Sequence, residues 1–548
     1  MKRSFKTILF VLTISTCLSV EYVSAQSYIR QPQVQPTLSY NSQALNFYTQ
    51  KLKQTLFLLY NGYVDTVNLN EVTEKAVIKV MEELDPHSQY ISAKDVKEME
   101  EPLLGKFEGI GIEYAIIRDT LTVQSVIPGG PSEKVGLKAG DKLNEVDGKV
   151  VSGTGLTQTK VLKLLRGDKG TKVRIGVLRG GQKHEVVITR DRIPLNTVTS
   201  SYEIKPGIWY SRLSNFGAET YDELMNPIKN HNGVLKGLIL DLRGNGGGYL
   251  HTALRIVNEF MERGQLILYS EGRAVKRTND FADGSGTLKR MPVVVLIDEN
   301  SASASEIVSG AIQDWDRGVI IGRRSFGKGL VQQEFALQDG SRLRLTVARY
   351  HTPSGRVIQS PYEMGKSDKY YENFVKRYSR GEIFNADSIK LNDSLKFKTL
   401  RLNRTVYGGG GIMPDIFIPV DTSYYSKGYL NAVNRGYMSD FVTIYSDRHR
   451  VEYESVYGSP TSDASFEKFC KDYVVTDEYF AEFLKYCEEK GVKFTEEDLA
   501  KSSTEIRKNL KGLIIRNIYG LDKYIRWANL YDKEVQRALS ELHKTQWR

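Results

Sequence analysis

The 548-residue sequence is poor in the residues that build metal sites and disulfide scaffolds, with three cysteines and seven histidines. Three cysteines cannot form a four-cysteine zinc site or a disulfide framework. The histidines show no His-x-x-Glu-His pattern, and no Cys-x-x-Cys pair occurs. The formal net charge is +10, but no run of five or more like charges concentrates it. We therefore expect no metal, no cofactor and no nucleic-acid partner.

The amino-terminal residues have the pattern of an export signal. Three basic residues among the first six precede an apolar stretch at 8–20, which is too short to span a membrane comfortably. Small residues follow, so we expect residues 1–25 to be a signal peptide cleaved after Ala25. This predicts a protein of the periplasm or cell envelope. An uncleaved membrane anchor is the alternative. Cys17 could suggest a lipoprotein, but the threonine before it is a poor neighbour for a lipidated cysteine.

Length and periodicity predict several domains. At roughly 100–200 residues per domain, three or four folded units are expected. Helical apolar spacing marks residues 26–104 and 423–548, whereas short β-branched runs with glycine punctuation occupy residues 105–192. Between residues 193 and 422, apolar strands alternate with helices, which predicts an α/β layer with a buried sheet. A polar, tyrosine-rich insertion is expected within this region at 361–404.

Several segments are assigned individually. A helix is expected at residues 158–165, and the strands expected from β-branched and apolar runs are 121–127, 142–146, 172–178, 185–188, 237–241, 293–298 and 319–322. Cys470 and Cys487 lie on the apolar stripes of consecutive carboxyl-terminal helices. A disulfide between them and a pair of buried thiols both remain open, and we favour the buried thiols.

A dense cluster of serines follows the strand that ends at Asp298. Ser301, Ser303 and Ser305 lie at the start of the next helix. The first turn of a helix offers unpaired N–H groups and a positive potential, which can hold an oxyanion beside a nucleophilic serine. Helix capping alone would explain the serines equally well. A catalytic interpretation therefore needs partners elsewhere in the chain.

Two glycine-rich turns supply candidate partners. At residues 237–248 an apolar strand enters a glycine turn, where backbone N–H groups can approach a ligand without a Cβ in the way. The segment 322–332 imitates a phosphate loop, but Gly329 stands where serine or threonine must hold magnesium, and a strand-like stretch follows. We reject nucleotide binding and interpret Lys328 as a general base. That role requires burial to lower its pKa from about 10.4 by roughly three units.

Together these motifs resemble those of the carboxyl-terminal processing peptidases (tail-specific proteases), which are PDZ-containing serine proteases with a Ser–Lys dyad. The resemblance spans about residues 84–420. It rests on Ser301-Ala-Ser-Ala-Ser-Glu-Ile307, Phe326-Gly-Lys-Gly-x-Val-Gln332, Asp241-Leu-Arg-x-Asn-x-Gly-Gly248, Leu84-Asp-Pro-His-Ser-Gln-Tyr90, Tyr350-His-Thr-Pro-Ser-Gly-Arg-Val-Ile-Gln359 and Gly411-Ile-Met-Pro-Asp-Ile416. It implies an α/β fold with a ClpP/crotonase-like protease core, an inserted PDZ domain and flanking helical regions. Gly246 stands where many relatives carry proline.

The resemblance also implies roles for individual residues. Ser303 matches the nucleophile, Lys328 the general base and Gln332 the residue that positions the lysine. The N–H groups of Ala304 and of Gly247, or of the next glycine, would form the oxyanion hole. In a straight strand the Cα atoms of residues 328 and 332 would lie about 13 Å apart, so the role of Gln332 rests on the resemblance alone.

A Ser-His-Asp triad is the competing catalytic arrangement. His251 and His351 lie inside the α/β region, but no sequence feature ties either of them to Ser303. Asp314 occupies a position that is often acidic in relatives. We expect its role to be structural.

Residues 105–192 resemble a PDZ domain of the bacterial, circularly permuted type. Phe107-Glu-Gly-Ile-Gly-Ile112 matches the carboxylate-binding loop, in which Gly109 and Gly111 would free N–H groups to bind a peptide carboxylate. The implied peptide-binding residues are Phe107, Gly109, Ile110, Gly111 and Arg166. A core position for one of the two isoleucines, and a solvated surface position for Arg166, remain open.

The preferred hypothesis is an exported endopeptidase that captures proteins or peptides with exposed apolar C-termini and cuts them near that end. Self-association as a homodimer or a higher homo-oligomer is left open. The alternative is a catalytically silent PDZ-containing peptide-binding protein or chaperone. The presence of both catalytic motifs argues against that alternative.

Overall fold

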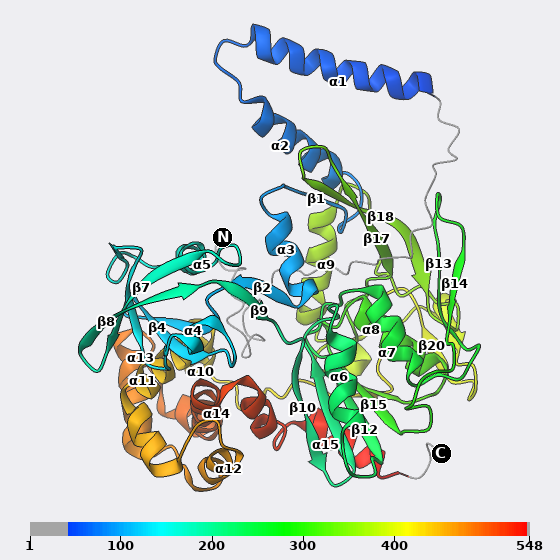
Figure 1. Cartoon of the computed structure of the whole chain (residues 1–548). Helices are drawn as coiled ribbons and strands as arrows, with labels where there is room; N and C mark the ends of the chain where they lie inside the picture. Colours follow the sequence, from blue (N-terminus) through cyan, green and yellow to red (C-terminus); the bar gives the residue numbers. More distant parts are fainter. Residues whose placement is uncertain (1–41, 545–548) are drawn as a thin grey trace. The chain divides into compact units, whose positions relative to one another are not determined.

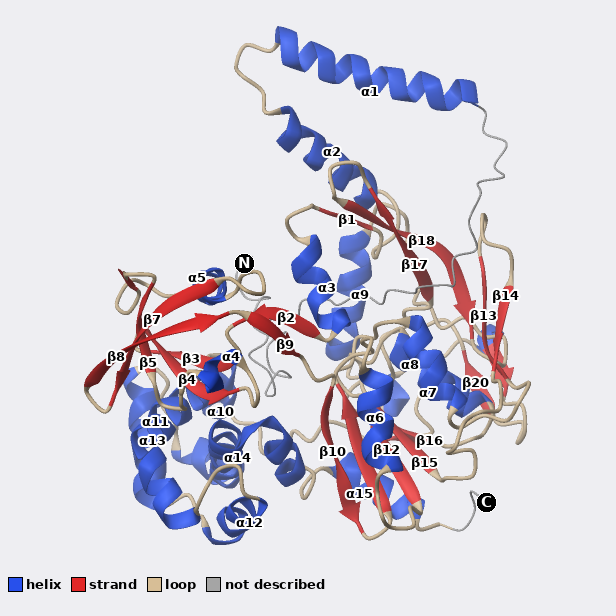
Figure 2. Cartoon of the chain, in the orientation of Figure 1, coloured by secondary structure: helices blue, strands red, loops and turns tan. Residues whose placement is uncertain are grey.

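The computed structural model describes residues 42–544 (Figures 1 and 2), so the expected signal peptide and its cleavage site lie outside the described residues. The described chain forms two compact units. One contains residues 105–204 and 420–536, and the other contains residues 42–104, 205–419 and 537–544.

The first unit begins with an antiparallel sheet in the order β3-β4-β5-β7-β8. Its strands are β3 (Ile112–Ile117), β4 (Thr120–Val126), β5 (Lys142–Val146), β7 (Lys172–Arg179) and β8 (Gln182–Thr189), with β6 (Lys149–Val150) paired to β5. Two helices, α4 (Pro131–Lys134) and α5 (Gln158–Leu165), and a β2 (Lys106–Gly109)–β9 (Asp191–Pro194) pair complete this part, followed by β10 (Val198–Lys205). Alternating side chains such as Val173, Ile175 and Val177 form its core. These elements confirm the expected strands, and β3 is left as an edge strand of its sheet.

The rest of the first unit is helical, as the periodicity predicts. Its helices are α10 (Lys427–Asn434), α11 (Tyr437–Tyr457), α12 (Asp463–Asp472), α13 (Asp477–Glu489) and α14 (Glu496–Ala528), and α15 (Lys533–Leu542) follows. Aromatic side chains dominate the core of this helical part. Cys487 is fully buried, Cys470 is half-buried, and both are free thiols. The preference for buried thiols over a disulfide is therefore confirmed, although Cys470 is only partly covered.

The second unit holds the expected buried parallel sheet. Strands β11 (Ile208–Leu213), β12 (Gly237–Asp241), β15 (Val293–Ile297), β16 (Val319–Gly322) and β21 (Ile416–Phe417) follow one another in the sheet. Helices α6 (Thr220–Lys229), α7 (Leu250–Asn258) and α8 (Ala304–Asp314) connect them. Every residue of β12 and β15 is buried, which explains why these strands are continuously apolar. Because β12, β15 and β16 are parallel neighbours, the loops after them emerge at one edge of the sheet.

A second, antiparallel sheet of this unit contains β1 (Gln89–Ile91), β13 (Leu266–Glu271), β14 (Thr278–Phe281), β17 (Leu330–Ala336) and β18 (Arg342–His351). Strand β1 belongs to the stretch that the sequence predicts to be helical. It becomes a strand because residues 89–91 pair with β18. The insertion folds around helix α9 (Ser367–Ser379), two short 3-10 helices (Ala386–Ser388 and Asp393–Leu395) and the strand β19 (Lys396–Lys398), which pairs with β20 (Thr405–Tyr407).

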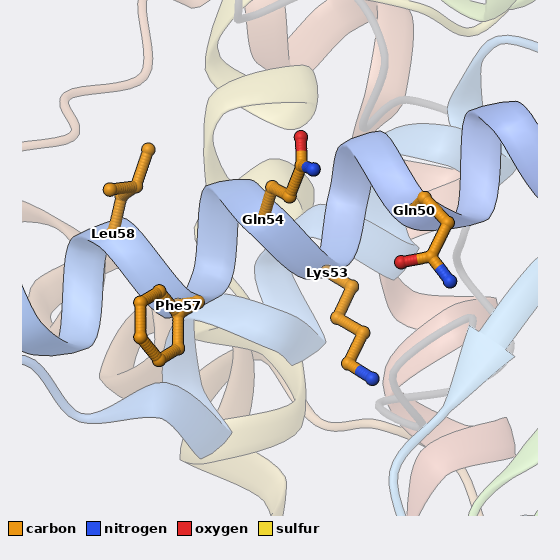
Figure 3. A pocket seen from close by; sticks show the side chains of 5 residues that line it. All are labelled: Gln50, Lys53, Gln54, Phe57 and Leu58. Carbon is orange, nitrogen blue, oxygen red and sulfur yellow. The ribbon is translucent and has the colours of Figure 1, made fainter.

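The amino-terminal helices are α1 (Ser42–Gly62), α2 (Leu69–Glu82) and α3 (Val96–Leu104). Large apolar side chains of α1 are exposed, and Figure 3 shows two of them, Phe57 and Leu58, projecting from the helix. Within residues 42–544, none of the helices combines the length and the apolar character needed to cross a membrane.

Candidate active site

The loops that follow β12 and β15 are joined by hydrogen bonds at the edge of the parallel sheet. The carbonyl oxygen of Asn245 accepts the N–H of Ala302 at 3.0 Å and the hydroxyl of Ser305 at 2.8 Å. The Ser301 hydroxyl donates to the carbonyl oxygen of Leu242 at 2.8 Å. Two of the three clustered serines therefore fasten the serine segment to the glycine turn.

Ser303 differs from its two neighbours in conformation and in surroundings. Its backbone has φ 53° and ψ −108°, a left-handed conformation that is uncommon outside glycine. Residues in such regions carry strain and are concentrated at functional sites. Ser303 also borders a pocket, whose lining residues are Gly248, Leu250, Leu268, Ser303, Ala304, Ile307, Leu330, Val331 and Tyr350. The structure thus singles out the serine that matches the nucleophile of the resembling family.

A buried carboxylate, Glu306, connects the serine segment to the lysine loop. Its Oε2 atom accepts the N–H of Ser303 at 2.8 Å and the N–H of Lys328 at 2.9 Å. Its Oε1 atom accepts the N–H of Gly327 at 2.8 Å and the hydroxyl of Ser325 at 2.5 Å. Sequence reasoning missed this residue, although Ser303-x-x-Glu306 has the spacing of a capping box. One carboxylate oxygen therefore holds the backbones of both candidate catalytic residues.

Tyr350 makes a second connection between the same two residues. Its hydroxyl lies 2.9 Å from the carbonyl oxygen of Lys328 and 3.3 Å from that of Ser303. The ring is buried, and burial is the main reason why the pKa of its hydroxyl is raised well above 10. The motif at 350–359 contains this residue, but only the three-dimensional structure indicates its contacts.

Lys328 is buried and its side chain has a defined partner. The Nζ atom donates to Oε1 of Gln332 at 2.8 Å. Burial, aided by the positive charge of Arg344, lowers its pKa to about 7, against the opposing influence of Asp85 and Glu306. The expectation that burial lowers the pKa of this lysine by roughly three units agrees with this environment, and about half of the amine is neutral at pH 7.

Lys328 and Gln332 meet because the lysine lies outside the strand that contains Gln332. The pairing of β17 with β18 shifts register between Val331 and Gln332. Lys328 itself precedes β17, so the two side chains are not separated by a straight strand, and the predicted separation does not apply. The other end of the Gln332 amide donates to the carbonyl oxygen of His87, in the turn before β1.

The candidate oxyanion-hole donors differ in whether their N–H groups are already hydrogen-bonded. A Cβ on Gly247 would lie 2.9 Å from Cβ of Ser303 and 3.1 Å from the nitrogen of Ala304. The N–H of Gly247, however, already donates to Oδ1 of Asn245 at 2.9 Å. The N–H groups of Ala304 and Gly248 have no acceptor within the described chain. The glycine turn therefore lies against Ser303, and Gly248 has the N–H that is available for a ligand.

The remaining candidates lie apart from this arrangement. His251 stacks on Tyr249, and His351 stacks on Tyr269. Neither is hydrogen-bonded to Ser303 in residues 42–544, so the described structure offers no Ser-His-Asp triad. Asp314 is fully buried and paired with Arg356 at 2.6 Å, consistent with the expected structural role. No group of three metal-binding side chains occurs within this part of the chain.

The PDZ candidates form a second site in the first unit. Gly111 has φ +76°, and a Cβ there would lie 2.9 Å from Cδ1 of Ile193. The Ile110 side chain is buried in the core, whereas Ile112 is only partly buried. The N–H groups of Ile110 and Gly111 have no acceptor among the residues described. The Cζ atom of Arg166 lies 5.1 Å from the ring centre of Phe107. Phe107 belongs to β2, which ends at Gly109, where the loop begins. Loop N–H groups and the edge strand β3 therefore occur together, as a peptide site requires.

Comparison with known proteins identifies related sequences along most of this chain. The model of peptidase family S41 matches residues 207–363, a PDZ-domain model matches residues 109–189, and a family of unknown function (DUF8443) matches residues 429–520. A carboxy-terminal-processing protease of Bartonella bacilliformis is 37% identical over 305 residues, or 54% of this chain and 69% of that protein. A probable CtpA-like serine protease of Staphylococcus aureus is 30% identical over 402 residues, or 72% of this chain and 79% of that protein.

Two solved structures are also similar. The photosystem II D1 C-terminal processing protease is 29% identical, with a TM-score of 0.31 over 56% of this chain and 83% of that chain. The PDZ domain of a carboxy-terminal protease from Vibrio cholerae, solved in complex with peptide, is 33% identical. It has a TM-score of 0.16 and covers 16% of this chain and 99% of that chain.

Proposed function

The chain belongs to peptidase family S41 and is a serine endopeptidase with a PDZ domain, and from that premise we propose that Ser303 and Lys328 form its catalytic dyad. The observation that carries the proposal is the buried lysine with a pKa of about 7, held on the same carboxylate oxygen as Ser303. A neutral lysine amine can accept the serine proton near neutral pH.

The proposed reaction is acyl transfer to serine followed by hydrolysis. Lys328 takes the Ser303 proton as the serine oxygen attacks the scissile carbonyl, and the N–H groups of Ala304 and Gly248 stabilise the oxyanion. Lys328 then gives the proton to the leaving amine, and water releases the acyl group. Gln332 orients the lysine through its 2.8 Å hydrogen bond.

The experiment that tests the dyad is a pH–rate profile with two variants. We expect kcat/KM of the wild type to rise through an acid limb near pH 7, because Lys328 must lose its proton. Ser303→Ala and Lys328→Ala should abolish cleavage while the protein remains folded by circular dichroism. Chelators should leave the rate unchanged. Full activity in either variant, or activity lost in EDTA and restored by zinc, would show that another site performs the chemistry.

The pocket beside Ser303 supports a preference for apolar side chains next to the cut. Leu250, Leu268, Ile307, Leu330 and Val331 line it. An apolar pocket excludes charged side chains because burying an unpaired charge is costly. The pocket has a volume of only about 10 Å³, so peptides with alanine at that position should be cut faster than those with aspartate or lysine, as measured by mass spectrometry of the products.

We also propose that substrates are captured by their C-termini at the PDZ domain and are cleaved near that end. The unpaired N–H groups of Ile110 and Gly111 support binding of a terminal carboxylate, and the edge strand β3 supports pairing with the preceding residues. The relatives named as carboxy-terminal-processing proteases support the same substrate class.

Export to the periplasm or cell envelope is proposed from residues 1–25 alone. Fractionation of cells that produce the full chain, with sequencing of the mature amino terminus, tests it. A mature chain beginning near Gln26 in the envelope fraction is the expected result. Retention of the full chain in the cytoplasm would contradict it.

Self-association is proposed from helix α1. Phe47, Leu52, Phe57 and Leu58 are each more than half exposed, and α1 has no acidic residue. Exposed apolar side chains of this kind are unfavourable in water and mark an interaction surface, for which we propose a second copy of this chain. Analytical ultracentrifugation should show a dimer or a larger assembly. Phe57→Glu should reduce the mass to that of the monomer, whereas a monomeric wild type would overturn the proposal.

A further inference from the structure

Helix α9, in the insertion at 361–404, lies against the loop that carries Lys328. The Arg377 guanidinium donates to the carbonyl oxygens of Arg324 at 2.7 Å, Ser325 at 2.9 Å and Phe326 at 3.5 Å. Arg377 is almost fully buried and pairs with the equally buried Glu382 at 3.4 Å. A buried, paired guanidinium bonded to three consecutive carbonyls holds that backbone in one conformation.

The same helix also contacts the turn before β1. The Tyr371 hydroxyl donates to the carbonyl oxygen of Pro86 at 3.0 Å, and the ring of Tyr370 packs edge-on against His87, with the ring centres 5.4 Å apart. The carbonyl oxygen of His87 accepts the amide of Gln332, whose other end holds Nζ of Lys328. Helix α9 therefore contacts both segments that fix the lysine.

We propose that α9 is a positioning element for the catalytic base and that Arg377 is its principal positioning residue, an inference that rests on the proposed role of Lys328. The insertion is thereby part of the catalytic architecture, because it supports the lysine through the loop at 324–326 and supports Gln332 through the turn at 85–88. Neither Arg377 nor Tyr371 lines the pocket beside Ser303. Their effect should consequently fall on the chemical step rather than on substrate binding.

The charged and titratable groups around the two side chains make the proposal testable by pH. Those acting on Lys328 are Arg344 of β18, Asp85 of the turn and Glu306 of α8, and Lys328 in turn lowers the pKa of His87 in the same turn. Those acting on Arg377 are Glu382, Glu299, Tyr378 and Glu306. Since Arg377 is not among the charges that shift the lysine, removing it changes the lysine mainly by loosening its surroundings. Water that enters would raise the pKa of Lys328 from about 7 toward 10.5.

The test compares the pH profiles of Arg377→Met and Arg377→Lys with that of the full-length wild type. We expect the acid limb of kcat/KM to move upward by about one pH unit in Arg377→Met, which makes the rate at pH 6.5 roughly tenfold lower, with recovery by pH 9. Arg377→Lys should show a smaller shift, and KM should change little in both. Lys376→Met is the matched control, because Lys376 is exposed on the same helix and forms a surface ion pair with Glu372.

An acid limb that stays at the wild-type pH in folded Arg377→Met would overturn the proposal, even if the rate falls equally at every pH. If Arg377→Met does not fold, Tyr371→Phe replaces it, since that variant removes only the hydroxyl bonded to Pro86. It should shift the limb in the same direction, and an unchanged limb would overturn the proposal. Failure of the dyad itself would be distinguishable, because Lys328→Ala would then retain activity whatever the Arg377 variants do.

Discussion

Among single residues, Glu306 and Tyr350 act on the backbones of Ser303 and Lys328 and leave the two side chains available for chemistry. Glu306 accepts both N–H groups, and the Tyr350 hydroxyl contacts both carbonyl oxygens. Four donors point at the Glu306 carboxylate, and these bonds oppose the rise in its pKa that burial causes. Backbone contacts thus fix the positions of the two residues, and the proposed proton transfer is left to their side chains.

The three clustered serines should respond differently to removal of the hydroxyl. Ser303→Ala should lower kcat/KM by about 10³-fold or more, because the nucleophile is lost. Ser301→Ala and Ser305→Ala should retain cleavage and lose about 1 kcal/mol of stability each, because their hydroxyls donate to backbone carbonyls. Peptide cleavage assays and urea unfolding provide the two measurements. If Ser303→Ala is active while Ser305→Ala is folded but inactive, the nucleophile is Ser305 and the assignment to Ser303 is wrong.

Burial of Lys328 has a cost in stability that depends on pH. Below pH 7 the lysine is protonated in both folded and unfolded chains, so the folded state bears the full cost, about 5 kcal/mol for a pKa lowered from 10.5 to about 7. Between pH 7 and 10.5 the unfolded chain binds a proton that the folded chain does not. Stability therefore rises with pH across this window, and the cost disappears above it.

Lys328→Met should accordingly stabilise the protease unit near neutral pH. The variant removes the buried charge but leaves Oε1 of Gln332 unpaired, which costs about 1–3 kcal/mol. We expect a net gain of roughly 2 kcal/mol at pH 6, falling to near zero at pH 9, measured as the shift of the unfolding transition by calorimetry. Equal stability of the two proteins at both pH values would contradict a depressed lysine pKa.

At the scale of elements, the glycine turn after β12 is shaped by its contact with the serine segment. Gly247→Ala would place a Cβ 2.9 Å from Cβ of Ser303, whereas at Gly244, with φ +72°, a Cβ meets no atom within 4 Å. We expect Gly247→Ala to lower kcat by about 100-fold, since one misplaced oxyanion donor costs that much. Gly244→Ala should cost only about 1 kcal/mol of stability. Similar rates in the two folded variants would show that the turn does not approach Ser303.

The contact between Lys328 and Gln332 marks the limit of what the sequence could predict at this scale. The strands β5, β12 and β16 and the helix α5 are found at the predicted residues, because local periodicity and burial determine them. The contact of Lys328 with Gln332 depends instead on pairing with β18, a non-local interaction. Local sequence does not determine the path of the chain at Lys328, just before β17, so the resemblance had to supply the partner.

For the whole molecule, the α/β class could be predicted from apolar strands that alternate with helices, and the PDZ domain from the resemblance of residues 105–192 to that family. The contacts of the insertion with the lysine loop could not be predicted from the sequence. Arg377 reaches the carbonyls of residues 324–326 from more than fifty positions away in the sequence, and Tyr371 reaches Pro86 from nearly three hundred. Long-range contacts of polar side chains leave no periodic signal, so a polar, tyrosine-rich stretch indicates only an insertion.

At the scale of the whole chain, the proposed peptide-binding loop of the PDZ domain and the proposed nucleophile Ser303 belong to different compact units, so the two proposals can be tested separately. Gly111→Ala would force a Cβ to within 2.9 Å of Ile193 at a φ of +76° and so distort the carboxylate loop. Gly148→Ala is the matched control, since its φ is +77° and its Cβ would meet nothing within 4 Å. Any general effect of backbone strain should therefore appear in both variants.

Wild type and Gly148→Ala should cut a peptide acid with about tenfold lower KM than the corresponding amide, because the loop N–H groups bind the charged carboxylate. Gly111→Ala should lose this preference by raising KM for the acid. All three proteins should hydrolyse a short ester that lacks a C-terminal carboxylate at the same rate, because Ser303 is unaffected. The measurement is steady-state kinetics on the acid, the amide and the ester. Equal KM for acid and amide in the wild type would show that the PDZ loop does not read the substrate terminus.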